Sequence, residues 1–238
     1  MRLNKYISSC GICSRREADK LISDGRIMLN GSIPSAGADV GDTDTVTLDG
    51  KRIVPRESHT YIAYYKPVGV ICTKNDPHAK RTVTGELGLN KNITYAGRLD
   101  KDSEGLLLMT DDGYLIDAMM KSKNAHEKEY EVTLDRPVTQ DFIRDLSKGV
   151  YLKDLDRTTR PCKARKTGDR SFDIILTQGL NRQIRRMCHE LGAQVERLKR
   201  IRVLTVRLDD YDLKPGGYAV ISDDKVKELY RITGLDTK

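Results

Sequence analysis

One segment of the 238-residue chain presents a carboxylate between two cations in a glycine-flanked loop, Gly97-Arg98-Leu99-Asp100-Lys101-Asp102-Ser103-Glu104-Gly105. An apolar run, Leu106–Met109, follows directly. A loop anchored by a buried strand is a well-fixed place for a reactive side chain. Asp100 has the chemistry of a nucleophile, a general base or a metal ligand. An aspartate that caps a helix or forms a turn is the structural alternative.

Further carboxylates at positions 102, 104, 111 and 112 raise a rival interpretation, a Mg²⁺ cluster for phosphodiester cleavage. The spacing weakens it, because Asp111-Asp112-Gly113 is typical of a simple turn. Cys10-x-x-Cys13 has no second ligand pair at zinc spacing. No phosphate-loop or dinucleotide fingerprint is present. We therefore expect no metal and no cofactor.

A second segment, residues 178–187, concentrates three arginines at the expected start of a helix over 182–191. Ile184, Met187, Cys188 and Leu191 form its buried stripe, and Asn181 is a plausible N-cap. Arg182, Arg185 and Arg186 would then oppose the helix dipole. Cations in that position indicate an anionic partner, either a protein carboxylate or a phosphate.

A third segment, Glu129–Leu134, reads as a strand with one charged and one apolar face. Tyr130 lies on the apolar face with Val132 and Leu134, and a core tyrosine is the default interpretation. A tyrosine at the edge of such a face is also able to stack on a nucleic-acid base.

The elements before residue 59 predict a small module. The pattern predicts a helix over Leu3–Ser9 and a second helix introduced by a Ser14/Glu17 capping box and closed by Asp24-Gly25. Short strands are expected near Ile27–Leu29, Val46–Leu48 and Ile53–Val54, separated by turns such as Asn30-Gly31 and Asp49-Gly50. We expect domains over 1–58 and 59–238, with a linker at 55–59.

The remaining chain is richer in strand signals, and the fold class expected is α+β with a mostly antiparallel, mixed sheet. Strands are predicted over 61–65, 68–72, 106–110, 129–134, 172–177 and 203–208. Helices are predicted over 115–120, 140–146, 182–191 and 223–229. Strands and helices do not alternate strictly, which argues against a doubly wound sheet.

Charge is distributed unevenly. The chain has a formal net charge of +7, while residues 157–207 alone hold fourteen Lys and Arg against four acids. Concentrated positive charge is typical of a protein that faces a polyanion. The N-terminal segment lacks an apolar signal core, and no run approaches a membrane span. Five dispersed cysteines favour reduced thiols, so we expect a cytoplasmic protein with no membrane partner.

Together these motifs closely resemble the RsuA/RluB/RluE/RluF family of pseudouridine synthases over essentially the whole chain. The resemblance rests on GRLDKDSEGLLLMTDDG at 97–113, KPVG at 66–69, KEYEV at 128–132 and GLNRQIRRM at 179–187. The first 58 residues resemble an S-four-like RNA-binding domain, and HEKEYEVTL with KRIRVLTV resembles the RluF branch most. The chain departs at its end, where a mildly acidic tail replaces the basic extension of some RluF-type members.

The resemblance implies an RNA pseudouridine synthase, an isomerase that needs no cofactor. Asp100 matches the essential aspartate, Tyr130 the tyrosine that packs on the target base, and Arg185 the basic residue that pairs with the aspartate. Two groups of residues are expected to contact RNA. Around the catalytic residues they are Arg98, Lys66, Asn181, Arg182 and Arg186; in the N-terminal module they are Arg2, Lys5, Arg15, Arg16 and Lys20.

The expected partner is ribosomal RNA, large-subunit rather than small-subunit, with a structured transfer RNA as a second candidate substrate. A monomer is the default oligomeric state. Two other classes stay open at this stage: a non-catalytic RNA-binding or ribosome-assembly protein, which has no need of Asp100, Tyr130 and Arg185 together, and a metal nuclease, which EDTA would inactivate.

Overall fold

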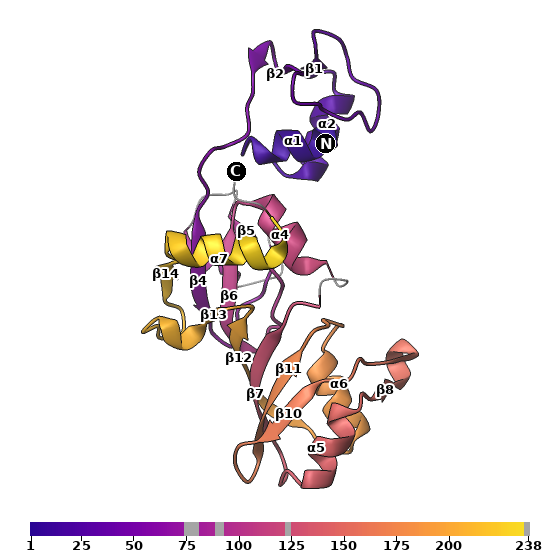
Figure 1. Ribbon diagram of the computed structural model, residues 1–238, viewed down its shortest axis with the longest axis vertical. Helices are drawn as coiled ribbons and strands as arrows, with labels where there is room; N and C mark the ends of the chain where they lie inside the picture. Colours follow the sequence, from indigo (N-terminus) through magenta and orange to yellow (C-terminus); the bar gives the residue numbers. More distant parts are fainter. Residues whose placement is uncertain (74–80, 89–92, 122–124, 236–238) are drawn as a thin grey trace. The chain divides into compact units, whose positions relative to one another are not determined.

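The computed structural model describes residues 1–73, 81–88, 93–121 and 125–235, which fall into two compact units (Figure 1). The first unit comprises Met1–Thr60 with Asn90–Thr94 and Thr110–Gly113, and the second comprises Tyr61–Leu89, Tyr95–Met109 and Tyr114–Lys238. Residues 53–60, which include the segment expected as a linker, form no helix or strand.

The first unit contains two helices and a small antiparallel sheet. The elements are α1 (Leu3–Ser9), α2 (Arg15–Ser23), β1 (Ile27–Leu29), β2 (Val46–Leu48) and β3 (Lys51–Arg52), with the strand order β1-β2-β3. The expected capping box is present: the Ser14 hydroxyl accepts from the Glu17 amide, and the Glu17 carboxylate accepts from the Ser14 amide. Leu3, Ile7, Ala18, Ile27 and Val46 are buried together in its core.

The third strand of this sheet lies two residues earlier than predicted. Asp49 and Gly50 both have positive φ, 49° and 80°, which is the conformation of a two-residue hairpin turn. The turn pairs Leu48 directly with Lys51. The strand therefore begins at Lys51 and does not cover Ile53–Val54.

The second unit is built on a mixed, mostly antiparallel sheet, as the sequence predicts. Its main path runs β10-β11-β7-β12-β6-β4-β14, with β12 parallel to β6 and antiparallel to β7. The strands are β4 (Tyr61–Lys66), β5 (Thr94–Tyr95), β6 (Glu104–Thr110), β7 (Lys128–Leu134), β10 (Lys163–Lys166), β11 (Ser171–Leu176), β12 (Val195–Val203), β13 (Val206–Arg207) and β14 (Tyr218–Val220). A separate hairpin pairs β8 (Tyr151–Leu152) with β9 (Arg157–Thr158).

Helices pack on this sheet in two groups, each with its own core. The helices are α3 (Val83–Leu87), α4 (Gly113–Met120), α5 (Gln140–Ser147), α6 (Gln183–Glu190) and α7 (Asp223–Thr233). Ile143 of α5 and Met187 of α6 pack with Val132 and Phe172 of the sheet. Leu115 of α4 and Leu229 of α7 pack with Ala63 and Leu106. The strands β7 and β12 lie between the two groups in the sheet (Figure 1).

Two predicted strands are wrong. Residues 68–72 form no strand, because Pro67 cannot donate to a ladder and Gly69, at φ 92°, turns the chain. The strand expected over 203–208 instead ends at Val203. Leu204, at φ 54°, begins a turn that pairs Val203 with Val206, so β13 returns antiparallel to β12. The polar first half of β12 escaped prediction because its periodicity is not that of a half-buried strand.

The parallel contact between β6 and β12 depends on a glycine and a buried arginine. Arg200 is 1% exposed. Its Nε donates to the Leu106 carbonyl at 2.7 Å and its Nη2 to the Gly97 carbonyl at 3.2 Å. Gly105 has φ 105°, and a Cβ there would lie 2.3 Å from the Arg200 carbonyl oxygen. The backbones of the two strands are able to approach this closely only with glycine at position 105.

Replacing Gly105 with alanine is therefore expected to lower the free energy of unfolding by about 2–4 kcal/mol, from a positive φ and an overpacked contact together. Urea unfolding followed by circular dichroism measures the change. Gly179→Ala is the control, since a Cβ there meets nothing within 4 Å, and it should change stability by less than about 0.5 kcal/mol. Equal stability of the two variants would contradict the role given to Gly105.

Candidate active site

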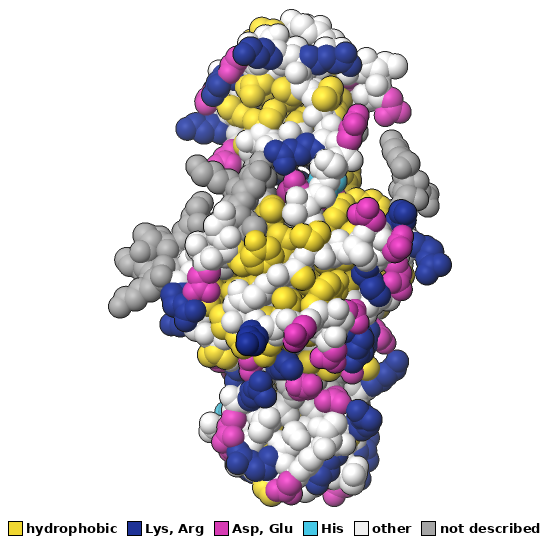
Figure 2. Space-filling view, turned by 90° about the vertical axis from the view of Figure 1, so that its left-hand side faces the viewer, with side chains coloured by type: hydrophobic (Ala, Val, Ile, Leu, Met, Phe, Trp, Pro, Cys, Tyr) yellow, Lys and Arg dark blue, Asp and Glu magenta, His cyan; other side chains and the backbone are white. Residues whose placement is uncertain are grey.

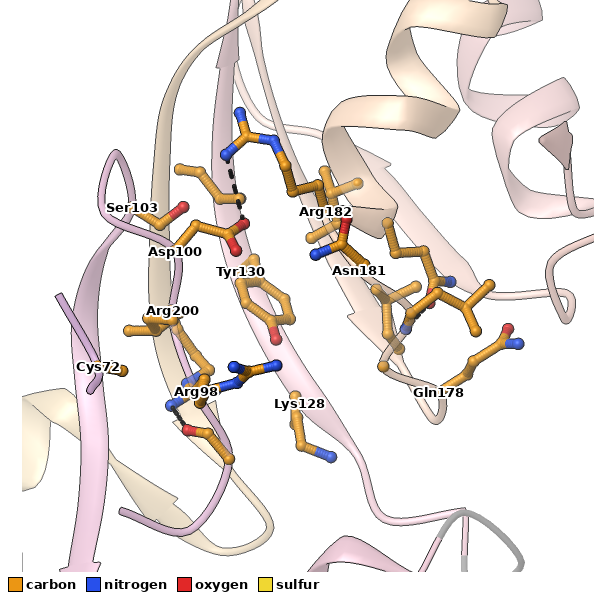
Figure 3. Close-up of a pocket in the computed structure, with 18 of the residues that line it drawn as sticks. Cys72, Arg98, Asp100, Ser103, Lys128, Tyr130, Gln178, Asn181, Arg182 and Arg200 are labelled. Carbon is orange, nitrogen blue, oxygen red and sulfur yellow. Dashed lines mark hydrogen bonds and ion pairs between the residues drawn. The ribbon is translucent and has the colours of Figure 1, made fainter. Parts of the chain in front are cut away.

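A pocket of about 500 Å³ opens beside the centre of the large sheet (Figure 3). Six segments line it: residues 71–72, the loop before β6, the end of α4, the first half of β7 with His126, the end of β11 with the start of α6, and Leu198 and Arg200 of β12. The lining includes Arg98, Asp100, Lys128, Tyr130, Asn181, Arg182 and Arg200. The structure therefore brings together residues from the three segments that the sequence singled out separately, and it adds others such as Lys128 and Arg200.

The loop that carries Asp100 is held at its main chain. Four of its carbonyl oxygens accept hydrogen bonds from donors elsewhere in the chain. They are Gly97 from Arg200 at 3.2 Å, Lys101 from the Gly69 amide at 2.7 Å, Asp102 from Arg185 at 2.9 Å and Ser103 from Lys66 at 2.7 Å. These bonds fix the backbone while the Asp100 carboxylate, 34% exposed, faces the pocket.

Lys66, which the sequence suggested as an RNA contact, lies inside the protein. Its side chain is fully buried, and its ammonium donates to the carbonyls of Pro67 and Ser103. Burial lowers the pKa of Lys66. Through these hydrogen bonds Lys66 stabilises the backbone of the Asp100 loop, which is a structural role.

The expected ion pair between Arg185 and Asp100 is replaced by a different arrangement. Arg182 binds Asp102 through two hydrogen bonds, of 3.0 and 2.7 Å. This contact holds the pKa of the Asp102 carboxyl below its usual range. The Arg185 Nε also lies 3.4 Å from the Asp102 carboxylate, and its Nη1 donates to the Val195 carbonyl. Arg182, 3.9 Å away, is the cation that pairs with Asp100.

The start of α6 explains why these roles differ from the prediction. Arg182, and not Asn181, is the N-cap residue, with a left-handed φ of 50°. That conformation directs its guanidinium toward the Asp100 loop, as Figure 3 shows. Arg186 bonds to the Asn181 carbonyl and pairs with Asp154 outside this pocket. Of the three arginines, Arg182 therefore faces the pocket most directly.

Tyr130 and Arg98 lie together in the pocket (Figure 3). Tyr130 is half-buried on β7, opposite Ile174 on one side and Arg200 on the other. Within the described residues its hydroxyl forms no hydrogen bond, so the group is open to a bound molecule. Arg98 is exposed, and its guanidinium lies near the hydroxyl end of the Tyr130 ring.

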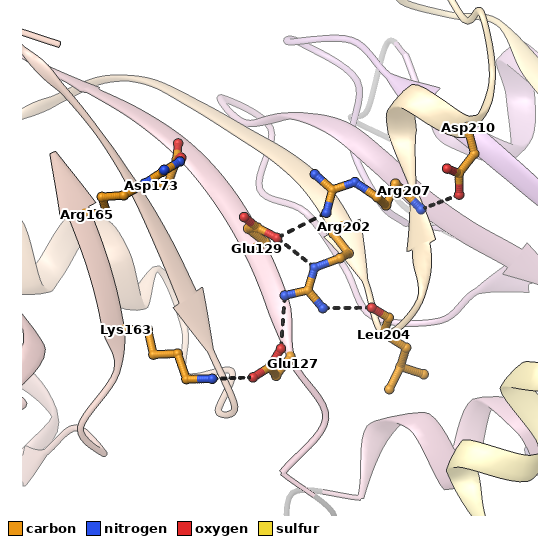
Figure 4. Close-up of polar contacts among 9 residues, drawn as sticks. All are labelled: Glu127, Glu129, Lys163, Arg165, Asp173, Arg202, Leu204, Arg207 and Asp210. Atoms are coloured by element: carbon orange, nitrogen blue, oxygen red, sulfur yellow. Dashed lines mark hydrogen bonds and ion pairs between the residues drawn. The ribbon is translucent and has the colours of Figure 1, made fainter. Parts of the chain in front are cut away.

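Most cations between residues 157 and 207 form ion pairs with acids of the same chain, so the excess of positive charge in this segment is largely matched within the protein. β7 and the residue before it contribute several of the acids, as Figure 4 shows for Glu127 and Glu129 with Arg202. The pairs are Lys163–Glu127, Arg165–Asp173, Arg170–Glu196, Arg186–Asp154, Arg197–Glu104, Lys199–Glu131 and Arg207–Glu129. On the face in Figure 2, Lys and Arg side chains lie interspersed with Asp and Glu.

The cations expected to bind RNA in the first unit lie on its two helices or beside them. Arg16 and Lys20 of α2 are exposed, and Lys5 of α1 and Arg15 of α2 are half-buried. Arg2, the N-cap residue of α1, donates to the Gly37 carbonyl. Arg16 and Lys20 thus present their charge most openly.

Sequence reasoning missed Arg200, Asp102 and Lys128 as parts of the site. Arg200 lies in a strand among apolar neighbours, and no local pattern distinguishes a buried arginine that binds carbonyls from a surface one. Lys128 could have been predicted as a site residue, because it lies two residues before Tyr130 and strand alternation puts both side chains on one face.

The described residues contain no group of three or more His, Cys, Asp or Glu side chains placed to hold a metal ion. Asp102 and Glu104, members of the rival carboxylate cluster, are bound to Arg182 and Arg197. Among the described helices, none has both the length and the apolar character needed to cross a membrane.

The fold and this site define an RNA pseudouridylate synthase preceded by an S4 domain. A family model described as RNA pseudouridylate synthase matches residues 60–190, and the S4 domain matches residues 1–46. The chain belongs to the RNA pseudouridylate synthase family. A solved structure described as a pseudouridylate synthase is similar over 96% of this chain and 99% of its own, with a TM-score of 0.70 and 28% identity.

The relatives of known name are also RNA pseudouridine synthases. The dual-specificity RNA pseudouridine synthase RluF of Escherichia coli strain K12 is 42% identical over 234 residues, which cover 98% of this chain and 79% of the relative. The ribosomal large subunit pseudouridine synthase B of Yersinia pestis is 32% identical over 247 residues, covering 100% and 77%. An RNA pseudouridine synthase of Aquifex aeolicus is 34% identical, covering 98% and 97%.

The structural role of Lys66 predicts the effect of replacing it. Lys66→Met keeps the length of the side chain but leaves two buried carbonyl oxygens without a donor, at about 1–3 kcal/mol each. The free energy of unfolding should fall by about 2–4 kcal/mol in urea titrations. Lys101→Met, an exposed lysine on the same loop, is the control and should be nearly neutral. Unchanged stability of Lys66→Met with weaker RNA binding would restore the original expectation.

Proposed function

We propose that this protein isomerises a uridine of ribosomal RNA to pseudouridine, with Asp100 as the essential carboxylate. One observation carries the proposal: Asp100 and Tyr130 line a single pocket, and the loop beneath Asp100 is fixed at four of its carbonyl oxygens. A carboxylate whose backbone is held in place is suited to attack or deprotonate a sugar at a defined position.

The reaction breaks the C1′–N1 bond of the uridine and forms a C1′–C5 bond. The proton on C5 leaves and N1 gains one, so atoms and charge balance without a redox step. Asp100 acts in its ionised form, as a nucleophile on the ribose or as a base toward a ribose proton. The Arg182 Nη1 lies 3.9 Å from a carboxylate oxygen of Asp100 and forms an ion pair with it. Asp102 and Arg185 act through Arg182 and the loop, so we assign them positioning roles.

The target uridine must leave its stack to reach the pocket, at a free-energy cost of a few kcal/mol. Arg98, exposed beside Asp100, is suited to occupy the space that the base vacates. The ring of Tyr130 is placed to hold the detached base by stacking while it turns. Contacts between basic side chains and flanking phosphates offset part of the unstacking cost.

The proposed substrate is large-subunit ribosomal RNA, in keeping with the names of the RluF and synthase B relatives, with transfer RNA as a second candidate substrate. The S4 domain supplies RNA affinity through its exposed cations, above all Arg16 and Lys20. We further propose a domain boundary near residue 58, a monomer, and action in the cytoplasm.

Asp100→Asn is expected to reduce pseudouridine formation by at least about 10³-fold, the scale of acid–base or nucleophilic catalysis, while RNA affinity stays within about threefold. Ribosomal RNA is incubated with each protein, and pseudouridine is mapped by carbodiimide modification and primer extension. EDTA should not affect the wild type, and the RNA should remain intact. Turnover of the variant close to wild type would refute the assignment of Asp100. RNA binding without conversion, or EDTA-sensitive cleavage, would favour the other two classes.

The family resemblance implies that the Tyr130 hydroxyl also assists proton transfer, so Tyr130→Phe is expected to slow single-turnover conversion by about 10²–10⁴-fold. Stability should change by less than about 0.5 kcal/mol, because the hydroxyl has no partner among the described residues. Rates and thermal unfolding are measured on the same preparations. A large drop in melting temperature would show that Tyr130 is a core residue.

A further inference from the structure

Lys128, the first residue of β7, points into the same pocket as Asp100 and Tyr130 (Figure 3). Alternate residues of a strand share a face, so Lys128 and Tyr130 lie on the same side of the sheet, about 7 Å apart along the strand. Because a lysine ammonium is carried on a flexible four-carbon stem, a base held against the Tyr130 ring lies within its reach.

The ammonium of Lys128 has no carboxylate partner among the described residues. Its neighbours Glu127 and Glu129 face the opposite side of the sheet, where Arg202 binds both (Figure 4). The Lys128 Nζ makes one long contact, 3.5 Å, with the His126 carbonyl oxygen. Most other lysines and arginines of the large sheet are matched with an acid, so this cation stands out.

The surroundings of Lys128 disfavour a positive charge. Burial lowers its pKa, and the nearby guanidinium of Arg200 lowers it further. An ammonium held under those conditions, without an acid to compensate it, is stabilised when negative charge arrives. A reaction that develops negative charge near Lys128 would therefore be stabilised by this ammonium.

The proposed isomerisation develops negative charge on the base. When the C1′–N1 bond breaks, the electron pair stays with uracil, and the charge spreads over N1 and the two carbonyl oxygens. We propose that Lys128 is a further catalytic residue, whose ammonium donates a hydrogen bond to a carbonyl oxygen of the detached uracil and stabilises its negative charge. Lys128 keeps its proton throughout. The negative charge disappears when C5 bonds to C1′, and C5 then loses its proton as N1 gains one. This inference rests on the proposed function.

The test is single-turnover conversion of ribosomal RNA at saturating enzyme by Lys128→Met and Lys128→Arg. Loss of one donor to a developing oxyanion slows comparable reactions by about 10²–10³-fold, and we expect that loss for Lys128→Met with RNA affinity within about threefold. Lys128→Arg, which keeps the charge, should recover most of the rate. Lys163→Met is the matched control. Its ammonium lies on the opposite face of the sheet, bound to Glu127, and the rate should not change.

Two results would overturn the inference. One is a wild-type rate for Lys128→Met. The other is an unchanged saturated rate with weaker binding and a salt slope reduced by about one, which marks a phosphate contact. If the Lys128→Met variant does not fold, Lys128→Ala is measured in its place, with and without added ethylammonium. Added ethylammonium should then raise its rate several-fold, and no rise would count against the inference. Absence of pseudouridine with the wild type would instead contradict the proposed function.

Discussion

The buried guanidinium of Arg200 joins the two halves of the site. It reaches across the parallel contact between β12 and β6 and binds carbonyl oxygens on both sides of the Asp100 loop, at Gly97 and Leu106. A buried arginine with its donors satisfied is costly to place but strongly directional. Its hydrogen bonds need the close backbone approach that Gly105 permits. Lys66 and Arg185 bind two further carbonyl oxygens of the loop, those of Ser103 and Asp102. The Asp100 carboxylate is therefore carried on a backbone that is fixed at several points.

The same sheet separates two electrostatic environments. On one face, Glu127, Glu129 and Glu131 pair with cations of β10 and β12. The exposed pair among them, Lys163–Glu127, contributes about 0–1 kcal/mol. On the other face Arg98, Lys128 and Arg182 line a pocket together with Asp100. In this pocket Arg98 and Lys128 have no acidic partner among the described residues, whereas most cations on the opposite face are matched by acids.

Local signals predicted much of this protein. The capping box at Ser14, the hairpin turn at Asp49-Gly50 and the amphipathic α5 were all predictable, because their causes lie within a few residues. The charge pattern was not: a window over 157–207 misses the glutamates of β7, which come from an earlier strand and reach those cations only through sheet pairing. The pairing of Arg185 with Asp100 was wrong for a similar reason. Because Arg182 has a left-handed backbone at the start of α6, Arg182 pairs with Asp100, and Arg185 contacts Asp102 instead.

The central claim is that the pocket beside Asp100 and Tyr130 receives the target nucleotide. Photo-crosslinking tests it most directly: ribosomal RNA carrying 4-thiouridine at the modified position is bound to the wild-type protein, irradiated and analysed by peptide mass spectrometry. The account predicts adducts within the segments that line the pocket, 97–101, 128–130 and 178–182. Adducts confined to residues 1–46 would contradict it, because the target base would then lie on the S4 domain and away from Asp100.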